Sequence, residues 1–266
     1  MSDSKEFDPI EKRDASVQID ASRSFSPASD ISPERIIDAR HRAVQKSETA
    51  FRLVLGSRSP RRRQLLIEQG YRFAILPSED GIEERAEETE LRDAEPERFV
   101  DGLAFLKARN VVERLKKSEE EARKEFEPFF PKEERTPFVV VSCDSVAVCG
   151  GEILGKPRDR DDAERMLRRL SGTRHSVITG LCVWRVDPAG RVPSKTVRRV
   201  EISILQMEEL SEERLASYLA SGLWEGKAGA FGYQDGNDWL ELVSGTASNV
   251  VGLPTEALAL LLDEEF

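Results

Sequence analysis

The chain has 266 residues, 39% of them hydrophobic and 34% charged, which is enough for one large domain or two small ones with a real core. A formal net charge of −10 argues against broad binding to nucleic acids or to membrane surfaces. No apolar run approaches the ~20 residues of a membrane-spanning helix, and the polar N-terminus has no signal-peptide core. These features predict a cytoplasmic protein that binds neither nucleic acid nor membrane.

The three cysteines, Cys143, Cys149 and Cys182, lack paired CxxC spacing, so they suggest neither a disulfide framework nor a zinc site. All three lie in apolar, strand-like runs. We therefore expect them to be small buried hydrophobic residues.

Residues 1–50 are predicted to be an N-terminal extension that is largely disordered, because the first part is rich in Ser, Asp and Glu and shows no clear periodicity. Residues 33–48 could form a short helix, although its apolar face is thin. The folded domain is expected to span residues 51–266, with a charged, proline-bearing insertion at 118–136 outside its core.

Strands and helices alternate through this domain. The apolar runs predict strands at 51–56, 71–77, 138–143, 146–149, 174–186, 195–207 and 238–243. Helical spacing and capping residues predict helices at 59–69, 96–117, 159–172, 211–220 and 254–262. Strands interleaved with helices, together with the long hairpin around residues 187–190, predict an α/β fold with a mixed sheet.

The helix expected from Ser59 begins with three arginines, Arg61 to Arg63, at the end where the helix dipole disfavours cations. Gly56 allows close backbone approach, and Ser57 adds a hydroxyl donor. Free backbone N–H groups and guanidinium groups could therefore converge on one phosphate, although the sequence is not a P-loop. The alternative is a solvated basic face.

Asp144 follows the expected strand at 138–143, so it should lie at the carboxyl end of a central strand, where α/β sheets collect ligands and catalytic groups. A carboxylate there could bind a divalent ion or activate water, or it could merely begin a turn.

Two lysines and a glutamine are further candidates. Lys156, between a glycine and a proline, is either a point charge for phosphate or a solvated loop residue. Lys107, beside the apolar positions of its helix, either reaches a cleft or lies at the core edge. Gln234, in the glycine-rich stretch 226–236, offers a donor and an acceptor to a base edge, or belongs to a surface loop.

Six stretches together resemble the Maf family of nucleoside triphosphate pyrophosphatases. In chain order they are "LVLGSRSPRRRQLL", "LAFLKA", "CDSVAVCGGEILGKP", "AERMLRRLSGTRHSVITG", "KAGAFGYQDG" and "SNVVGLP". The first 50 residues and the segment near 118–136 have no counterpart in the family core. The resemblance implies an elongated mixed β-sheet flanked by helices, with two lobes, a nucleotide cleft between them, and a possible homodimer.

The resemblance also implies roles for individual residues. Asp144 would be the proton acceptor and would hold a divalent metal cation, Mg²⁺ or Mn²⁺, together with Glu84 or its neighbour Glu83. The substrate-binding residues would be Ser57, Arg61, Arg62, Lys107, Ser145, Lys156 and Gln234. Arg63 matches nothing that the chemistry requires.

The implied reaction is hydrolysis of a nucleoside triphosphate between the α and β phosphates, giving the monophosphate and pyrophosphate. Gln234 matches the branch that accepts dTTP and UTP, whereas Ser145 replaces the threonine more often found there. Two alternatives stay open: a nucleotide-binding regulator of cell division with little turnover, and a 7-methyl-GTP-type pyrophosphatase. Retention of a base at Asp144 favours an enzyme over a regulator.

Overall fold

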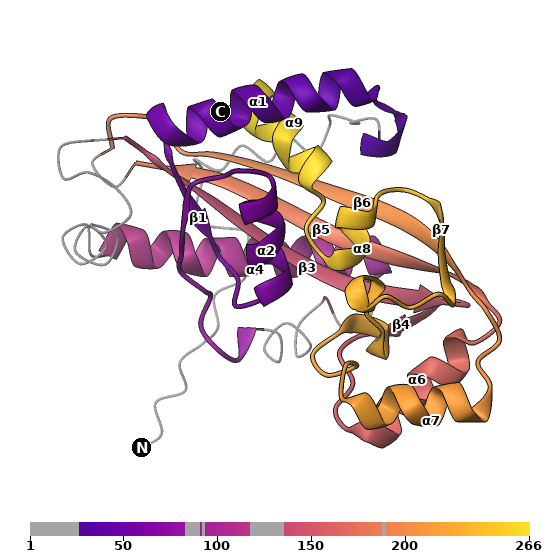
Figure 1. Ribbon diagram of the computed structural model, residues 1–266. Helices are drawn as coiled ribbons and strands as arrows, with labels where there is room; N and C mark the ends of the chain where they lie inside the picture. Colours follow the sequence, from indigo (N-terminus) through magenta and orange to yellow (C-terminus); the bar gives the residue numbers. More distant parts are fainter. Residues whose placement is uncertain (1–26, 83–90, 92–93, 118–135, 188–189) are drawn as a thin grey trace, which may run out of the picture.

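The computed structural model describes residues 27–82, 91, 94–117, 136–187 and 190–266. At its centre is a seven-stranded mixed sheet in the order β2-β1-β3-β5-β6-β7, with β4 pairing to β3 off this path (Figure 1). The strands are β1 (Arg52–Leu55), β2 (Phe73–Ile75), β3 (Phe138–Cys149), β4 (Glu152–Leu154), β5 (Arg174–Val186), β6 (Lys195–Met207) and β7 (Leu240–Ser244). This architecture confirms the α/β class and the mixed sheet predicted from the sequence.

Helices cover both faces of the sheet (Figure 1). They are α1 (Pro33–Thr49), α2 (Pro60–Glu68), α4 (Pro96–Lys117), α6 (Arg160–Leu170), α7 (Glu212–Ser221), α8 (Ala247–Val251) and α9 (Thr255–Glu265), with 3₁₀ turns at Ala28–Asp30, Ala228–Ala230 and Tyr233–Asp235. The quoted stretch "SNVVGLP" at 248–254 overlaps the short helix α8. Within the described ranges, no helix combines the length and the apolarity needed to span a membrane.

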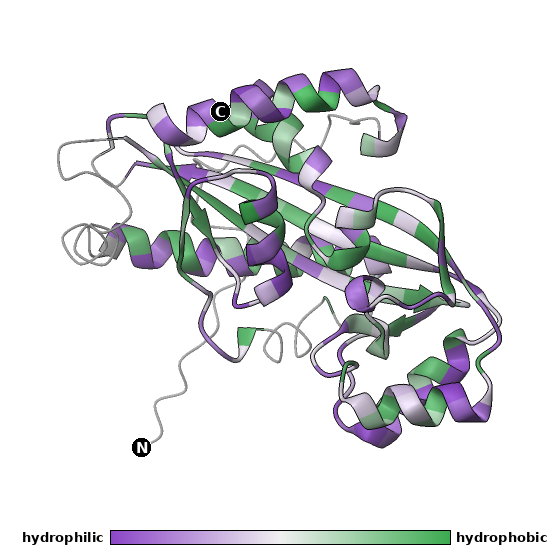
Figure 2. Cartoon of the chain, in the orientation of Figure 1, coloured by the Kyte–Doolittle hydropathy of each residue, from purple (hydrophilic) through white to green (hydrophobic). Residues whose placement is uncertain are grey.

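Strand periodicity divides the core between the two faces. Leu53 and Leu55 of β1 pack in the cluster that contains α9, whereas Val54 faces the cluster that contains α4. Figure 2 shows hydrophobic residues concentrated along the central strands and α9, with more hydrophilic residues on α1 and α2. The three cysteines are buried and unpaired, as expected from their apolar surroundings.

Helix α1 lies within the segment expected to be mostly disordered, and it packs against α9. Its contact face is made of small residues, with Ala39, Ala43 and Ser47 buried, so the two helices can approach closely. Arg42 reinforces the contact through an ion pair with Asp263 at 2.7 Å. The domain boundary at residue 51 stays a prediction, and most of the 118–136 insertion lies outside the described residues.

The expected strands at 138–143 and 146–149 are one continuous strand, β3. Its parallel pairing with β1 ends at Leu55 opposite Val141, while its antiparallel pairing with β5 continues past Asp144, which lies opposite Gly180. The prediction that a strand ends before Asp144 is therefore wrong. Strand β1 ends opposite Val141, so Asp144 lies beyond the end of β1, where it lines a cleft.

A buried histidine lies at the start of β5. His175 is 3% exposed and packs edge-on against Phe231, with ring centroids 5.3 Å apart. Burial lowers the pKa of His175 from 6.5 to about 4, against a smaller opposing effect of the Thr173 backbone. The imidazole is therefore neutral in the folded protein at neutral pH.

The free energy of unfolding is expected to fall as the pH drops from about 6.5 towards 4. Over this window the unfolded chain binds a proton at residue 175 that the folded chain does not, so stability decreases by up to about 1.4 kcal/mol per pH unit. Urea unfolding across this range should show a steeper loss for the wild-type protein than for His175→Gln. The exposed histidine provides the control, because His41→Gln should keep the wild-type slope. Equal slopes for wild type and His175→Gln would contradict this assignment.

Candidate active site

A cleft of about 680 Å³ opens beside the end of β1, the middle of β3 and the loop at 226–236. Every site residue predicted from the sequence that the structure describes lines this cleft, namely Ser57, Arg61, Arg62, Lys107, Asp144, Ser145, Lys156 and Gln234. Glu83 and Glu84 lie outside the described residues. The structure thus brings together candidates that are far apart in sequence, while their individual roles stay predictions.

The three arginines at the start of α2 have different surroundings. Ser59 caps the helix by accepting a hydrogen bond from the Arg62 backbone N–H, and Pro60 occupies the first turn. Arg61 extends across the cleft and donates to the Gly226 carbonyl at 3.0 Å. Arg63 is exposed and does not line the cleft. The first two arginines therefore line the cleft and the third does not.

The Arg62 guanidinium bonds to four residues from three segments that line the cleft. Nε donates to the Gly252 carbonyl at 2.7 Å, and Nη1 donates to the Cys143 carbonyl at 2.8 Å and to Ser57 Oγ at 3.2 Å. Nη2 donates to Ser145 Oγ at 3.2 Å. Most of its donors are thus engaged by the protein. Arg62 organises the other candidate residues in addition to carrying charge, and sequence reasoning missed this function.

The electrostatics at Arg61 favour an anion. Burial lowers its pKa most strongly, the neighbouring charge of Arg62 lowers it further, and the Asp235 carboxylate opposes both effects. A partly desolvated cation beside another cation gains from a negative ligand. The unusual charge at the helix start is therefore compatible with a bound phosphate.

Asp144 forms a buried ion pair with Lys107, whose Nζ lies 2.5 Å from Oδ1. Both residues are 7% exposed. Lys107 reaches the sheet because α4 packs closely on β5 at Gly180, where an added Cβ would lie 2.8 Å from the Asp101 backbone nitrogen and closer still to the Val100 carbonyl. The glycine opposite Asp144 thus allows the helix to bring its lysine to the carboxylate.

The acids of the cleft supply oxygen donors of the kind that bind Mg²⁺. Among the residues that the structure describes, no group of three or more His, Cys, Asp or Glu side chains could hold a metal ion. Asp144 faces the cleft together with Glu79 and Asp80, two acids that the sequence analysis did not select. Mg²⁺ is commonly held by one or two carboxylates plus substrate phosphates, and this donor set fits that arrangement.

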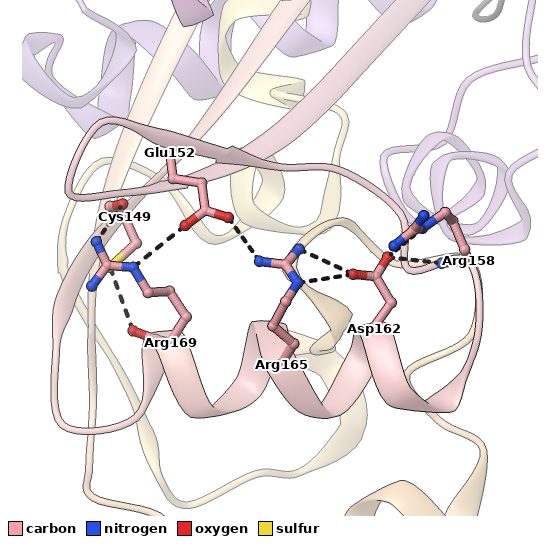
Figure 3. A network of polar contacts seen from close by, with 6 residues as sticks. All are labelled: Cys149, Glu152, Arg158, Asp162, Arg165 and Arg169. Carbon is pink, nitrogen blue, oxygen red and sulfur yellow. Dashed lines mark hydrogen bonds and ion pairs between the residues drawn. The ribbon is translucent and has the colours of Figure 1, made fainter.

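Lys156 lies on the loop between β4 and α6, and ion pairs anchor this loop on both sides (Figure 3). Before it, Glu152 accepts a bond from Arg165 at 2.7 Å. After it, Asp162 accepts from the Arg158 backbone N–H at 3.2 Å and from Arg165 Nε at 3.0 Å. Burial alone would raise the pKa of Asp162, but these bonds outweigh it and the net pKa is lowered. The lysine is therefore carried on a fixed stretch of backbone.

The family model described as Maf-like protein matches residues 52–265. The chain belongs to the Maf family. The sequence of this Maf protein is 44% identical over 212 residues to a dTTP/UTP pyrophosphatase of Rhodopirellula baltica, covering 79% of this chain and 81% of that protein. It is 38% identical over 214 residues to a dTTP/UTP pyrophosphatase of Anaeromyxobacter dehalogenans, covering 80% and 93%. The family resemblance stated from the sequence is confirmed.

A human relative is larger. It is named a probable bifunctional dTTP/UTP pyrophosphatase/methyltransferase protein and is 36% identical to this Maf protein over 205 residues. The match covers 76% of this chain and 30% of the human protein. The Maf unit thus also occurs as part of a longer chain.

Proposed function

We propose that this Maf protein hydrolyses nucleoside triphosphates between the α and β phosphates, releasing a monophosphate and pyrophosphate, with dTTP and UTP as substrates. The observation that carries the proposal is the convergence of an ion-paired carboxylate, Asp144, with cations from three separate elements in one cleft. The names of the relatives from Rhodopirellula and Anaeromyxobacter support it. The protein would act in the cytoplasm by removing unwanted nucleotides, and as a homodimer.

In this proposal Asp144 is the general base that takes a proton from the attacking water. Lys107 keeps the carboxylate oriented and adds positive charge near the phosphates. Arg61 and Lys156 neutralise the charge that develops on the departing pyrophosphate, and such preorganised charge is usually the largest catalytic contribution. Arg62 donates hydrogen bonds to Ser57 and Ser145, and the three residues shape the wall against which the triphosphate lies.

Asp144 and Glu84, with Glu83 as the alternative to Glu84, would hold Mg²⁺ or Mn²⁺. A divalent ion bound there supplies positive charge to the phosphate oxygens and lowers the pKa of nearby water. Asp144 lines the cleft next to Cys143, whose carbonyl binds Arg62, so an ion beside Asp144 would lie close to the cations that would bind the phosphates.

Gln234 would read the base edge. A 7-methyl-GTP-type site is expected to carry an acid in this stretch, and Asp235 is the acid next to Gln234. However, the Asp235 carboxylate accepts bonds from Lys227 and from Tyr218, so its oxygens are already engaged within the protein. This favours dTTP and UTP over 7-methyl-GTP.

Incubation of the full-length chain with dTTP, UTP, GTP or 7-methyl-GTP and Mg²⁺ should yield monophosphate and pyrophosphate, with the two pyrimidine nucleotides consumed fastest. Product identification by ³¹P NMR or ion-exchange chromatography checks the cleavage site. Release of orthophosphate would refute the proposed bond. Tight binding without turnover under either Mg²⁺ or Mn²⁺ would identify a nucleotide-binding regulator instead.

A further inference from the structure

The loop at 226–236 contains a buried polar cluster that the proposed reaction does not use. Lys227 Nζ lies 2.6 Å from Asp235 Oδ1 and also contacts Oδ2, and the Tyr218 hydroxyl donates to Oδ2 at 2.9 Å. The same hydroxyl accepts the Gly232 backbone N–H at 3.1 Å. The side chains of Lys227 and Asp235 are only 10% and 11% exposed. One carboxylate thus ties both ends of the loop to helix α7.

The loop is also closely packed around this cluster. A Cβ at Gly232 would overlap the Lys227–Asp235 pair. Ala230 has a φ of 61° and is fully buried, and it is the one non-glycine residue with positive φ among those described. Such a left-handed conformation costs about 1 kcal/mol and persists only where the surroundings hold it in place. Close packing therefore holds the loop in one conformation.

That conformation is connected to the phosphate side of the cleft. The Gly229 N–H donates to the Gly155 carbonyl at 3.0 Å, next to Lys156, and Arg61 donates to the Gly226 carbonyl at 3.0 Å. The negative charge of Asp235 also raises the pKa of Arg61, although burial keeps the net pKa of Arg61 lowered. The loop thus spans the cleft between the two cationic segments.

Gln234 is exposed at the cleft, and it lies in the single 3₁₀ turn Tyr233–Asp235. A turn this short has little rigidity of its own, so the direction of Gln234 depends on the anchoring of its neighbour. Because the Asp235 carboxylate is engaged by Lys227 and Tyr218, it presents no free negative charge to a base beside Gln234.

We propose that Asp235 is a positioning residue for base selectivity, which fixes Gln234 at the cleft through Lys227 and Tyr218. This inference rests on the proposed function, in which Gln234 reads a pyrimidine base. Asp235 itself would touch no substrate atom. Its removal should weaken discrimination between bases more than it weakens the chemical step.

The test combines Asp235→Asn, Tyr218→Phe and Gln234→Ala with binding and turnover measurements. Calorimetry with the non-hydrolysable α,β-methylene analogues of UTP and GTP gives a dissociation constant for each base. Asp235→Asn should reduce the preference for the UTP analogue by about tenfold, because the charge-assisted contact that holds the turn is lost. In the Gln234→Ala background the same substitution should change the preference less than about twofold. Asp235 affects the preference only by positioning Gln234, so its effect disappears once Gln234 is removed.

Tyr218→Phe removes one hydrogen bond and keeps the ion pair, so it should give a smaller loss in the same direction. Glu212→Gln is the matched control, because Glu212 is an ion-paired acid of α7 outside the cleft, bonded to Arg168 at 2.6 Å. With UTP as substrate, Asp235→Asn and Tyr218→Phe should raise KM while kcat changes little, and Glu212→Gln should leave both unchanged. Thermal unfolding of each variant verifies that it is folded.

An equal loss of affinity for both analogues, or an undiminished effect in the Gln234→Ala background, would overturn the inference and leave Asp235 a purely structural residue. Absence of a base preference in the wild-type protein would overturn it as well. Failure of the wild-type protein to hydrolyse any triphosphate would refute the proposed function separately, because the binding comparison does not depend on turnover.

Discussion

Asp144→Asn is expected to lower kcat on the order of 1,000-fold, because the amide cannot take a proton from the attacking water. The substitution preserves the shape of the side chain. It leaves Lys107 without the carboxylate that lies 2.5 Å away, so some loss of stability is also expected. Steady-state kinetics with dTTP and UTP, together with circular dichroism to verify folding, measure the two effects separately.

Asp187→Asn is the matched control for Asp144→Asn. Asp187 is also 7% exposed and ion-paired, with Arg191 at 2.8 Å, but it lies at the end of β5 and does not line the cleft. Its replacement should reduce stability and leave kcat within about twofold, as expected for a buried ion pair remote from the chemistry. If Asp144→Asn kept more than about a tenth of the wild-type kcat, Asp144 would not be the general base, because loss of a general base lowers kcat by more than this.

Gly180→Ala is expected to destabilise the protein by about 3 kcal/mol and to reduce kcat/KM by about 100-fold. The new methyl group would meet the backbone of α4 at Val100 and Asp101, which cannot rotate away as a side chain can. The helix must then shift. Lys107 lies two helical turns beyond Val100 on the same face, so the shift reaches the lysine that pairs with Asp144.

Urea unfolding and steady-state kinetics of Gly180→Ala test both parts of this expectation. Gly155→Ala is the control for stability, because no atom lies within 4 Å of the added Cβ and the backbone there is not left-handed. A Gly180→Ala protein with wild-type stability would show that α4 can move freely from the sheet. Lowered stability with unchanged kcat/KM would show that the position of Lys107 does not depend on this contact.

The sequence was informative about the elements and the fold class because their periodicity is strong. The expected helix at 96–117 coincides with α4, and the expected long hairpin strands coincide with β5 and β6. It was misleading at Asp144-Ser145, where two polar residues resemble a turn. In the structure both polar side chains face a cleft, so β3 tolerates them without a break.

The candidate site was predictable as a set of residues and not as a set of contacts. Motif resemblance selected residues that line one cleft. It could not show that Arg62 bonds to the Cys143 and Gly252 carbonyls, because backbone acceptors leave no signature in the sequence. The Lys227–Asp235 pair was missed although both residues stood within a quoted motif, since only the folded loop brings their charges together.

The strand order also bears on how the molecule reaches its folded state. Strands β5 and β6 follow one another closely in the sequence, so their pairing closes a small loop, whereas the β1–β3 pairing joins Leu55 to the distant Val141. We expect the antiparallel part of the sheet, with Asp144 already in register, to form before the segment that carries Arg61 docks. A folding chain would then hold its carboxylate before it holds its phosphate-binding cations, and catalytic competence would arise in the last step of assembly.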